Sequence, residues 1–337
     1  MPEQPSKDRP HPFKGAGAIP SLASSPASSP RLPLHSAPPR SLPAYAELAV
    51  TTNFTFLTGA SHPDEFVAHA AALGHSAAAI ADTNTLAGIV RAHTAAKDAG
   101  IPLAVGCRLV FTDPAGLAIL VYPTSRPAYS RLSRLLTIGK RRAPKGECRL
   151  ALHDLIEHSE GLLAVVLPPR ALSEDFLDTL AGLKRVFDDS RLSLATCREY
   201  GPDDAMRLRQ LADAADHAGI PVAAINDAHS HAPDRRMLQD VLTCIRRGCT
   251  IDEAGFLLHA NAERHLKPPE EMARLFADYP QAIARAAEVA ARAAAFSLDE
   301  LRYEYPPECP PGVSPADHLR DLTYRGAARR YPGGPPE

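Results

Sequence analysis

The amino-acid sequence predicts an α/β protein: a distorted, TIM-like (β/α)7 barrel followed by a small helical segment. From Tyr45 onward, short apolar runs alternate with amphipathic stretches. Strands that are apolar on both faces and separated by helices are typical of a parallel sheet covered by helices. Seven such units favour a closed barrel, and an open doubly wound sheet is the alternative.

Seven runs have the length and composition of buried strands. They cover residues 45–51, 76–81, 102–111, 117–122, 162–167, 191–196 and 222–225. Apolar residues at helical spacing predict helices between most of these runs. The exception is the turn over residues 112–116, which joins the third run to the fourth.

The sequence divides into four regions. Residues 1–44 are rich in Pro and Ser and carry several cations, which predicts a disordered leader without the apolar core of a secretory signal. Residues 45–232 hold the barrel, and residues 233–305 are expected to be a helical extension that completes it. Residues 306–337 begin with a Pro-rich linker and continue into an amphipathic helix. We expect that helix to open a further domain.

Composition narrows the classes of function. The chain has 37 Lys and Arg against 39 Asp and Glu, so any contact with nucleic acid must be local. No apolar run approaches the roughly 20 residues that cross a bilayer. The six cysteines form no CxxC pair, which argues against a zinc ribbon and predicts free thiols in the cytoplasm.

Three residues that follow predicted strands are candidate metal ligands. Asp82 follows the second run, and Asp227 and His229 follow the last. Catalytic groups of a parallel barrel lie at the carboxyl ends of its strands, so the three could share one site, with His231 on the same face. The alternatives are a polar loop after the last strand and a helix cap at Asp82.

A basic loop is the second candidate site. Lys140, Arg141, Arg142 and Lys145 lie within six residues and could contact phosphates of a nucleic acid. A solvated run of charges is the alternative. The sequence has no Gly-rich phosphate loop, no G-x-S-x-G and no H-E-x-x-H, which argues against the enzymes that those motifs define.

Several segments resemble the PHP (polymerase and histidinol phosphatase) domain that begins bacterial C-family DNA polymerases, above all those of the error-prone branch. They are Tyr45–Leu48, Asn53–His62, Ile80–Asn84, Leu86–Val90, Gly100–Gly106, Gly139–Cys148, Ala224–Asp227, Leu238–Arg246, Asn261–Lys267 and Leu301–Pro306. The resemblance spans residues 45–334 and implies a (β/α)7 PHP barrel.

The resemblance also implies a metal site that this sequence has largely lost. Ala49 and Thr51 stand where metal-binding members carry H-x-H, Thr83 replaces a His, and Arg108 replaces a Glu. Asp82, Asp227 and His229 keep the expected identity, and three ligands are too few for a cluster of two or three metals. We expect a vestigial site in which Arg108 pairs with an aspartate. Weak binding of one Zn²⁺ or Mn²⁺ is the alternative.

By resemblance, the full-length protein is an error-prone, translesion DNA polymerase that acts in tolerance of DNA damage. Its palm carboxylates would bind Mg²⁺ and extend a primer 3′ end. The palm would follow residue 337, so we expect this chain to be a structural piece without a cofactor of its own. Its partners would be DNA, through the full-length polymerase, the sliding clamp and other translesion-synthesis proteins. A metal-dependent phosphoesterase and a non-catalytic docking module are the alternatives.

Overall fold

The computed structural model describes residues 43–188, 190–302 and 309–334. The predicted leader lies outside the described residues up to residue 42, as does the stretch 303–308 where the predicted linker begins. The described residues from 43 onward fall in one unit. The predicted region boundaries within that unit remain predictions.

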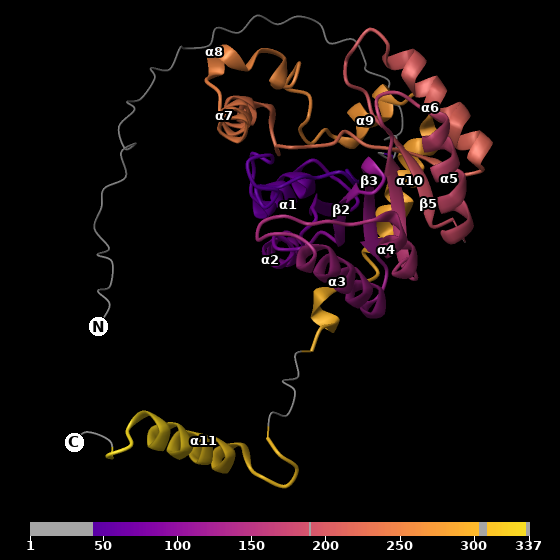
Figure 1. Ribbon diagram of the computed structural model, residues 1–337. Helices are drawn as coiled ribbons and strands as arrows, with labels where there is room; N and C mark the ends of the chain where they lie inside the picture. The colour runs from indigo at the N-terminus through magenta and orange to yellow at the C-terminus, as the bar shows by residue number, and fades with distance from the viewer. Residues whose placement is uncertain (1–42, 189, 303–308, 335–337) are drawn as a thin grey trace, which may run out of the picture. The chain divides into compact units, whose positions relative to one another are not determined.

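Six strands form one curled sheet in the order of the sequence, and helices surround it (Figure 1). The strands are β1 Ala78–Thr83, β2 Leu103–Thr112, β3 Ala115–Pro123, β4 Leu162–Leu167, β5 Leu192–Thr196 and β6 Val222–Ala224. The α/β class and the barrel-like curvature are confirmed. Every predicted strand after the first is found: β4 has the predicted ends, and the ends of the others differ by at most two residues.

The sheet is mixed, whereas the sequence predicted an all-parallel sheet. Strand β3 is antiparallel to both of its neighbours, whereas β1–β2, β4–β5 and β5–β6 pair in parallel. The reason is the short turn between β2 and β3, which can join only antiparallel strands, since a parallel connection needs a dozen or more residues. The run of parallel units is therefore interrupted once.

The first predicted strand, residues 45–51, is a buried segment outside the sheet ladder. It makes isolated backbone hydrogen bonds on two sides: the Val50 carbonyl accepts from Ala81 of β1, and the Thr51 N–H donates to Ala228 after β6. The N–H of Ala49 donates to the side chain of Glu47 and not to a neighbouring strand. The segment thus lies between the two ends of the sheet, which explains why its sequence has the composition of a strand.

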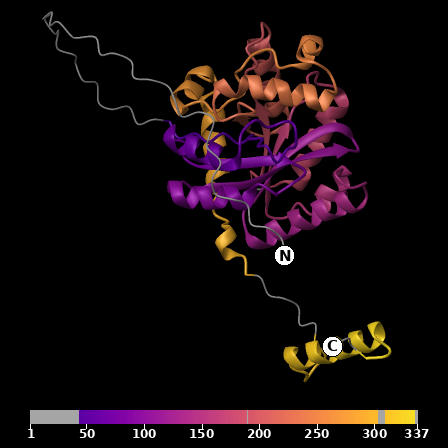
Figure 2. The ribbon, with the colours of Figure 1, turned by 90° about the vertical axis from the view of Figure 1, so that its left-hand side faces the viewer.

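Helices lie around much of the sheet in Figures 1 and 2. The helices of the described residues are α1 Pro63–Ala72, α2 Ile89–Ala99, α3 Arg126–Arg141, α4 Leu152–Glu157, α5 Glu174–Val186, α6 Asp204–Ala218, α7 Arg236–Arg247, α8 Ile251–Ala254, α9 Pro269–Leu275, α10 Pro280–Ala293 and α11 Pro315–Arg330, the last of which has no buried residue. Short 3-10 turns lie at η1 Pro233–Arg235, η2 Gly255–Leu257 and η3 Leu298–Glu300. Helix α10 packs on β6 and β2, so the helical extension covers part of the sheet.

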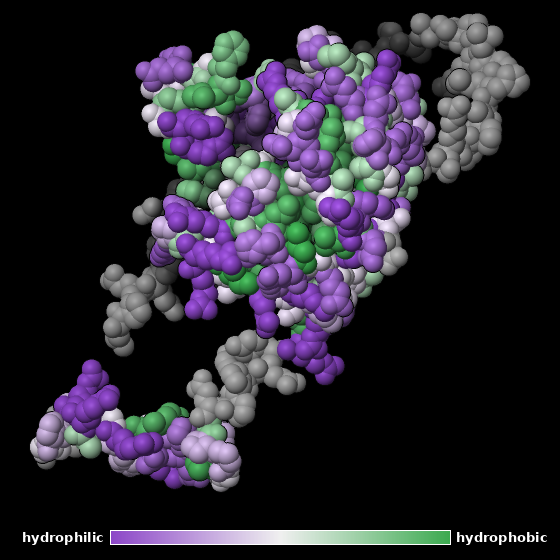
Figure 3. All heavy atoms as spheres, turned by 45° about the vertical axis from the view of Figure 1, so that its right-hand side comes forward, coloured by the Kyte–Doolittle hydropathy of each residue, from purple (hydrophilic) through white to green (hydrophobic). Residues whose placement is uncertain are grey.

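The main core lies between the sheet and these helices. Val165, Leu120 and Ile119 of the central strands are fully buried, and α3 contributes Leu132 and Leu135 from its inner face. Hydrophilic side chains cover much of the face drawn in Figure 3, with apolar side chains gathered near its centre. Among the described residues, no helix is long and apolar enough to cross a membrane.

Candidate functional site

Asp227 lies just past the carboxyl end of β6 in a cluster with two arginines. Arg108, from the middle of β2, donates a hydrogen bond to Oδ1 of Asp227. Arg264 donates from Nη1 to the other carboxylate oxygen at 2.8 Å. The side chains of Asp227 and Arg108 are only 15% and 14% exposed. Asp227 also has a φ of 49°, a left-handed conformation that Asp tolerates better than most residues.

The charges of this cluster favour the ion pair. Burial alone would raise the pKa of Asp227, but Arg108, His229 and Arg264 outweigh it and hold that pKa well below its ordinary value. Burial would lower the pKa of Arg108, and the adjacent Asp227 reverses that effect. Both partners are therefore charged at neutral pH, and the carboxylate is neutralised by protein cations.

His229 is buried beside this cluster and is neutral. Its Nε2 lies 3.6 Å from Oδ1 of Asp227 and 3.4 Å from Nη1 of Arg264. Burial lowers the pKa of His229. The Nε2 atom thus faces both a carboxylate oxygen and a guanidinium group. The buried Nδ1 has no hydrogen-bond partner among the described residues.

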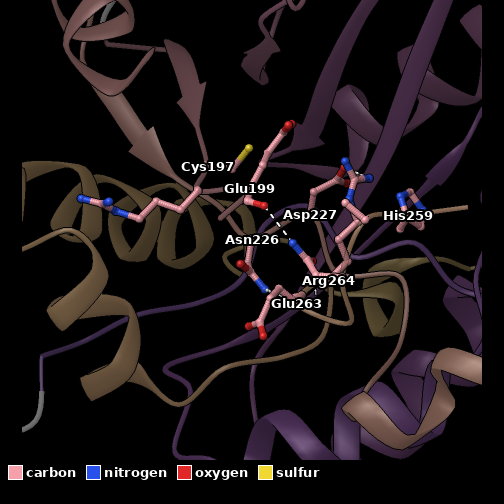
Figure 4. Close-up of a pocket in the computed structure, with 10 residues that line it drawn as sticks. Cys197, Glu199, Asn226, Asp227, His259, Glu263 and Arg264 are labelled. Atoms are coloured by element: carbon pink, nitrogen blue, oxygen red, sulfur yellow. Dashed lines mark hydrogen bonds and ion pairs between the residues drawn. The ribbon is translucent and has the colours of Figure 1, made fainter. Parts of the chain in front are cut away.

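A cavity of about 100 Å³ opens next to the cluster. Figure 4 shows Arg264 and Asp227 in its wall, together with Cys197, Asn226 and His259. Burial and the charge of Arg264 lower the pKa of His259 to about 4. Burial raises the pKa of Cys197 to about 12, so this thiol stays protonated and is a poor metal ligand and nucleophile.

Asp82 lies in a separate hydrogen-bond network. Thr52 donates to it twice, from its backbone N–H at 2.8 Å and its hydroxyl at 2.7 Å, and the Thr55 hydroxyl donates at 2.7 Å. Burial raises the pKa of Asp82 although these donors oppose the shift. Asp82 does not cap a helix, because α2 begins at Ile89 with Gly88 as its N-cap. Its contacts fix the 52–59 loop to β1.

The loop that holds Asp82 permits no side chain at Gly59. A Cβ there would lie 2.2 Å from the backbone oxygen of Thr52. The same loop is tied to the residues after β6, since the N–H of Ala60 donates to the carbonyl of His229. Asp82 and Asp227 are thus linked through backbone, and their carboxylates bond to different side chains.

A buried carboxylic acid, Glu47, lies behind the cluster and was not among the predicted site residues. It accepts hydrogen bonds from the Tyr45 hydroxyl at 2.6 Å and from the N–H groups of Ala49 at 2.9 Å and Asn226 at 2.7 Å. Burial raises its pKa to about 7, and the three donors offset only part of that shift. Glu47 therefore joins the segment 45–51 to the end of β6.

Glu47 predicts a dependence of stability on pH. Its pKa is higher in the folded chain than its ordinary value of 4.5, so its contribution is fully present below 4.5 and is lost as the pH rises through about 7. Between these values the free energy of unfolding should fall by up to ~1.4 kcal/mol per pH unit. Urea unfolding at a series of pH values gives the slope of unfolding free energy against pH for the chain and for Glu47→Gln. The difference between the two slopes measures the contribution of Glu47.

The difference is needed because buried histidines act in the opposite direction. Burial lowers the pKa of His75 and His229, so their contribution is lost as the pH falls through their folded pKa. Both proteins keep these histidines, and their effect cancels. Equal slopes for the chain and for Glu47→Gln would show that Glu47 does not titrate in this range.

The predicted basic loop is split by the structure. Lys140 and Arg141 end α3, and Lys145 is exposed in the following loop. Arg142 donates a hydrogen bond from Nη1 at 2.6 Å to Asp154, whose side chain is only 2% exposed. Arg142 therefore has a structural role as the partner of a buried carboxylate, and the other three cations remain candidates for phosphate contacts.

The residues of the cluster do not fit a metal cluster of the kind that the resemblance implies. Two guanidinium groups occupy the oxygens of Asp227, and cations at that distance repel a metal ion. His231 turns to Ser61, whose Oγ lies 2.8 Å from its Nδ1. In the described ranges, no group of three or more His, Cys, Asp or Glu side chains is arranged to hold a metal ion.

Comparison with known proteins agrees with the geometry. The family model named "PHP domain" matches residues 47–190. An error-prone DNA polymerase of Caulobacter vibrioides is 51% identical over 296 residues, which are 87% of this chain and 27% of that protein. Error-prone DNA polymerase 1 of Agrobacterium fabrum is 48% identical over 88% of this chain and 27% of its own length.

Among solved structures, an amidohydrolase from Chromobacterium violaceum aligns with a TM-score of 0.42 and 16% identity, over 57% of this chain and 89% of that one.

The matched residues 47–190 hold strands β1 to β4 of the curled sheet and are a PHP domain by that match. Over most of its length, the chain is homologous to bacterial error-prone DNA polymerases. It spans about a quarter of the length of these relatives.

Proposed function

We propose that this chain is the PHP region of an error-prone DNA polymerase and that its barrel is structural. The observation that carries the proposal is the Arg108–Asp227–Arg264 cluster, in which protein cations take the place of metal ions at the strand ends. A site built in this way stabilises the fold without a metal. The whole polymerase would add deoxynucleotides to a primer 3′ end with Mg²⁺ in its palm.

The proposal extends to the regions and partners of the chain. Residues 45–232 would be the PHP barrel, residues 233–305 its helical extension, and residues 306–337 a linker and the start of the palm. DNA would be bound through the whole polymerase, which acts in the cytoplasm, and the sliding clamp is a further partner. Homology to error-prone DNA polymerases over most of the chain supports these assignments.

A chimera tests the proposal. In it, this chain replaces the matching 27% of the Caulobacter vibrioides relative. If the chain is an intact PHP region, the chimera should extend a primed template with activity within about tenfold of the parent, because catalysis lies in the retained palm. Primer extension on a gel measures this activity. A folded chimera without extension would contradict the proposal, and a palm-carboxylate variant of the chimera is the negative control.

The docking-module alternative is favoured by one helix. Helix α7 exposes Met237 (75%), Val241 (43%) and Ile245 (60%) on one face. Its buried residues include the polar Gln239 and Thr243. Burial of polar residues with exposure of apolar ones at i, i+4 and i+8 is the reverse of a surface helix. If this face is an interface, it would contact the rest of the polymerase. The docking function would then add to the structural role of the barrel.

A further inference from the structure

Helix α3 carries a row of cations that the stability of the helix does not explain. Residues 126–149 contain eight Lys and Arg and a single acid, Glu147, in a chain with a net charge of −2. The helix itself contains no Asp or Glu. Its inner face packs into the core through Ala128, Leu132 and Leu135, so the charges gather on the opposite face.

Arg126, Arg134 and Arg141 are exposed and lie on one face of α3, at intervals of eight and seven residues. With Ser130 and Thr137 between them they follow the i, i+3 and i, i+4 spacings of neighbours on a helix surface. We call these three arginines the α3 stripe. At 1.5 Å per residue, they are about 12 and 10 Å apart along the helix axis.

The α3 stripe is not held by acidic side chains. Among the described residues, the ion pairs of this helix involve other cations: Arg131 pairs with Glu160, and the C-cap Arg142 pairs with Asp154. Arg126 lies in the first turn, where a cation opposes the helix dipole and costs stability. Arg134 has another cation, Arg131, three residues before it, which is also unfavourable. An anionic partner outside the chain would offset these costs.

We infer that the α3 stripe binds the phosphate backbone of duplex DNA. Its spacing of about 12 Å matches the width of the major groove, so neighbouring arginines can contact phosphates on its two sides. The Ser130 hydroxyl between the first two arginines can donate to a phosphate oxygen, as Ser does in protein–DNA contacts. Binding of this kind is independent of base sequence.

A single strand is the poorer fit to this face. Proteins that bind single strands stack the bases on exposed aromatic side chains. The aromatic residue of α3, Tyr129, is half-buried and stacks on Phe296 with ring centroids 5.1 Å apart. Lys140, next to Arg141, and Lys145, in the loop after the helix, are both exposed and enlarge the positive surface. The inference rests on the proposed function only in taking DNA as the polyanion.

Fluorescence anisotropy tests the inference with a labelled duplex of about 20 base pairs, roughly two helical turns. The purified chain is compared with the triple variant Arg126→Gln, Arg134→Gln and Arg141→Gln. Each lost phosphate contact should lower the slope of log K against log salt by about one. The triple variant should therefore bind at least tenfold more weakly at about 50 mM salt, with a slope smaller by about three.

The matched control is the triple variant Arg170→Gln, Arg185→Gln and Arg209→Gln, which removes three exposed arginines from other parts of the surface. It has the same net charge and should bind as the unaltered chain does. Circular dichroism establishes that both variants fold. Equal weakening in the two variants, or undetectable binding of the unaltered chain at about 50 mM salt, would overturn the inference.

Two further outcomes separate this inference from its rivals. Stronger stripe-dependent binding to vesicles with anionic lipid, or to a single strand, than to the duplex would overturn it. The chimera described above can extend primers whether or not the α3 stripe binds DNA. A stripe variant that binds DNA normally therefore contradicts this inference alone, and an inactive folded chimera contradicts the proposed function alone.

Discussion

Replacing Arg108 with Met should lower the free energy of unfolding by about 3 kcal/mol, toward the lower end of the range for breaking a buried ion pair. The change leaves Asp227 charged and 15% exposed, with Arg264 as its remaining arginine partner. Met keeps much of the apolar volume of the arginine stem, so the loss reflects charge more than packing. Urea unfolding followed by circular dichroism measures the effect.

A second substitution distinguishes charge from packing. In the double variant Arg108→Met/Asp227→Asn, the buried charge is gone, and Asn tolerates the left-handed backbone at position 227 as Asp does. Much of the lost stability should return. The matched control is Arg131→Met, which breaks a pair whose partner Glu160 is 80% exposed and should cost less than about 1 kcal/mol. Similar losses for Arg108→Met and Arg131→Met would contradict the structural role of the cluster.

Much of the fold could be predicted from the sequence because apolar runs report burial. Strand β4 was predicted with its observed ends, and β5 within one residue, because β5 is buried throughout and β4 at all but its last residue. Residues 45–51 were wrongly predicted to be a strand of the sheet for the same reason. Its residues are buried as a strand's would be, but its N–H groups bond to Glu47 and to isolated neighbours. The periodicity of apolar residues indicates which residues are buried, but it does not show which residues pair with a neighbouring strand.

The candidate site was predicted in part. The pairing of Arg108 with an aspartate was expected from the resemblance, which places Arg108 at a position of the lost metal site, and the pairing is observed. Arg264 was missed because it comes from a loop 37 residues after Asp227, and no local pattern marks a loop that folds back. Asp82 was expected to share a site with Asp227, but Thr52 and Thr55 take its oxygens, and nothing in their sequence distinguishes them from ordinary loop residues.

The expected common face of Asp227, His229 and His231 also fails for a physical reason. Alternation of side chains requires an extended backbone, whereas β6 ends at Ala224 and Asp227 has a φ of 49°. His229 is buried beside the arginines and His231 bonds to Ser61. Strand spacing is therefore a poor guide once the chain has left the sheet.

Metal content tests the central claim most directly. The purified chain is incubated with Zn²⁺ or Mn²⁺, dialysed and analysed by mass spectrometry, and the same samples are assayed for hydrolysis of bis(p-nitrophenyl) phosphate. Arg108 and Arg264 neutralise Asp227, so we predict no stoichiometric metal, no hydrolysis and no difference between the chain and His229→Ala. Stoichiometric metal with hydrolysis that His229→Ala abolishes would contradict the structural role and establish a phosphoesterase.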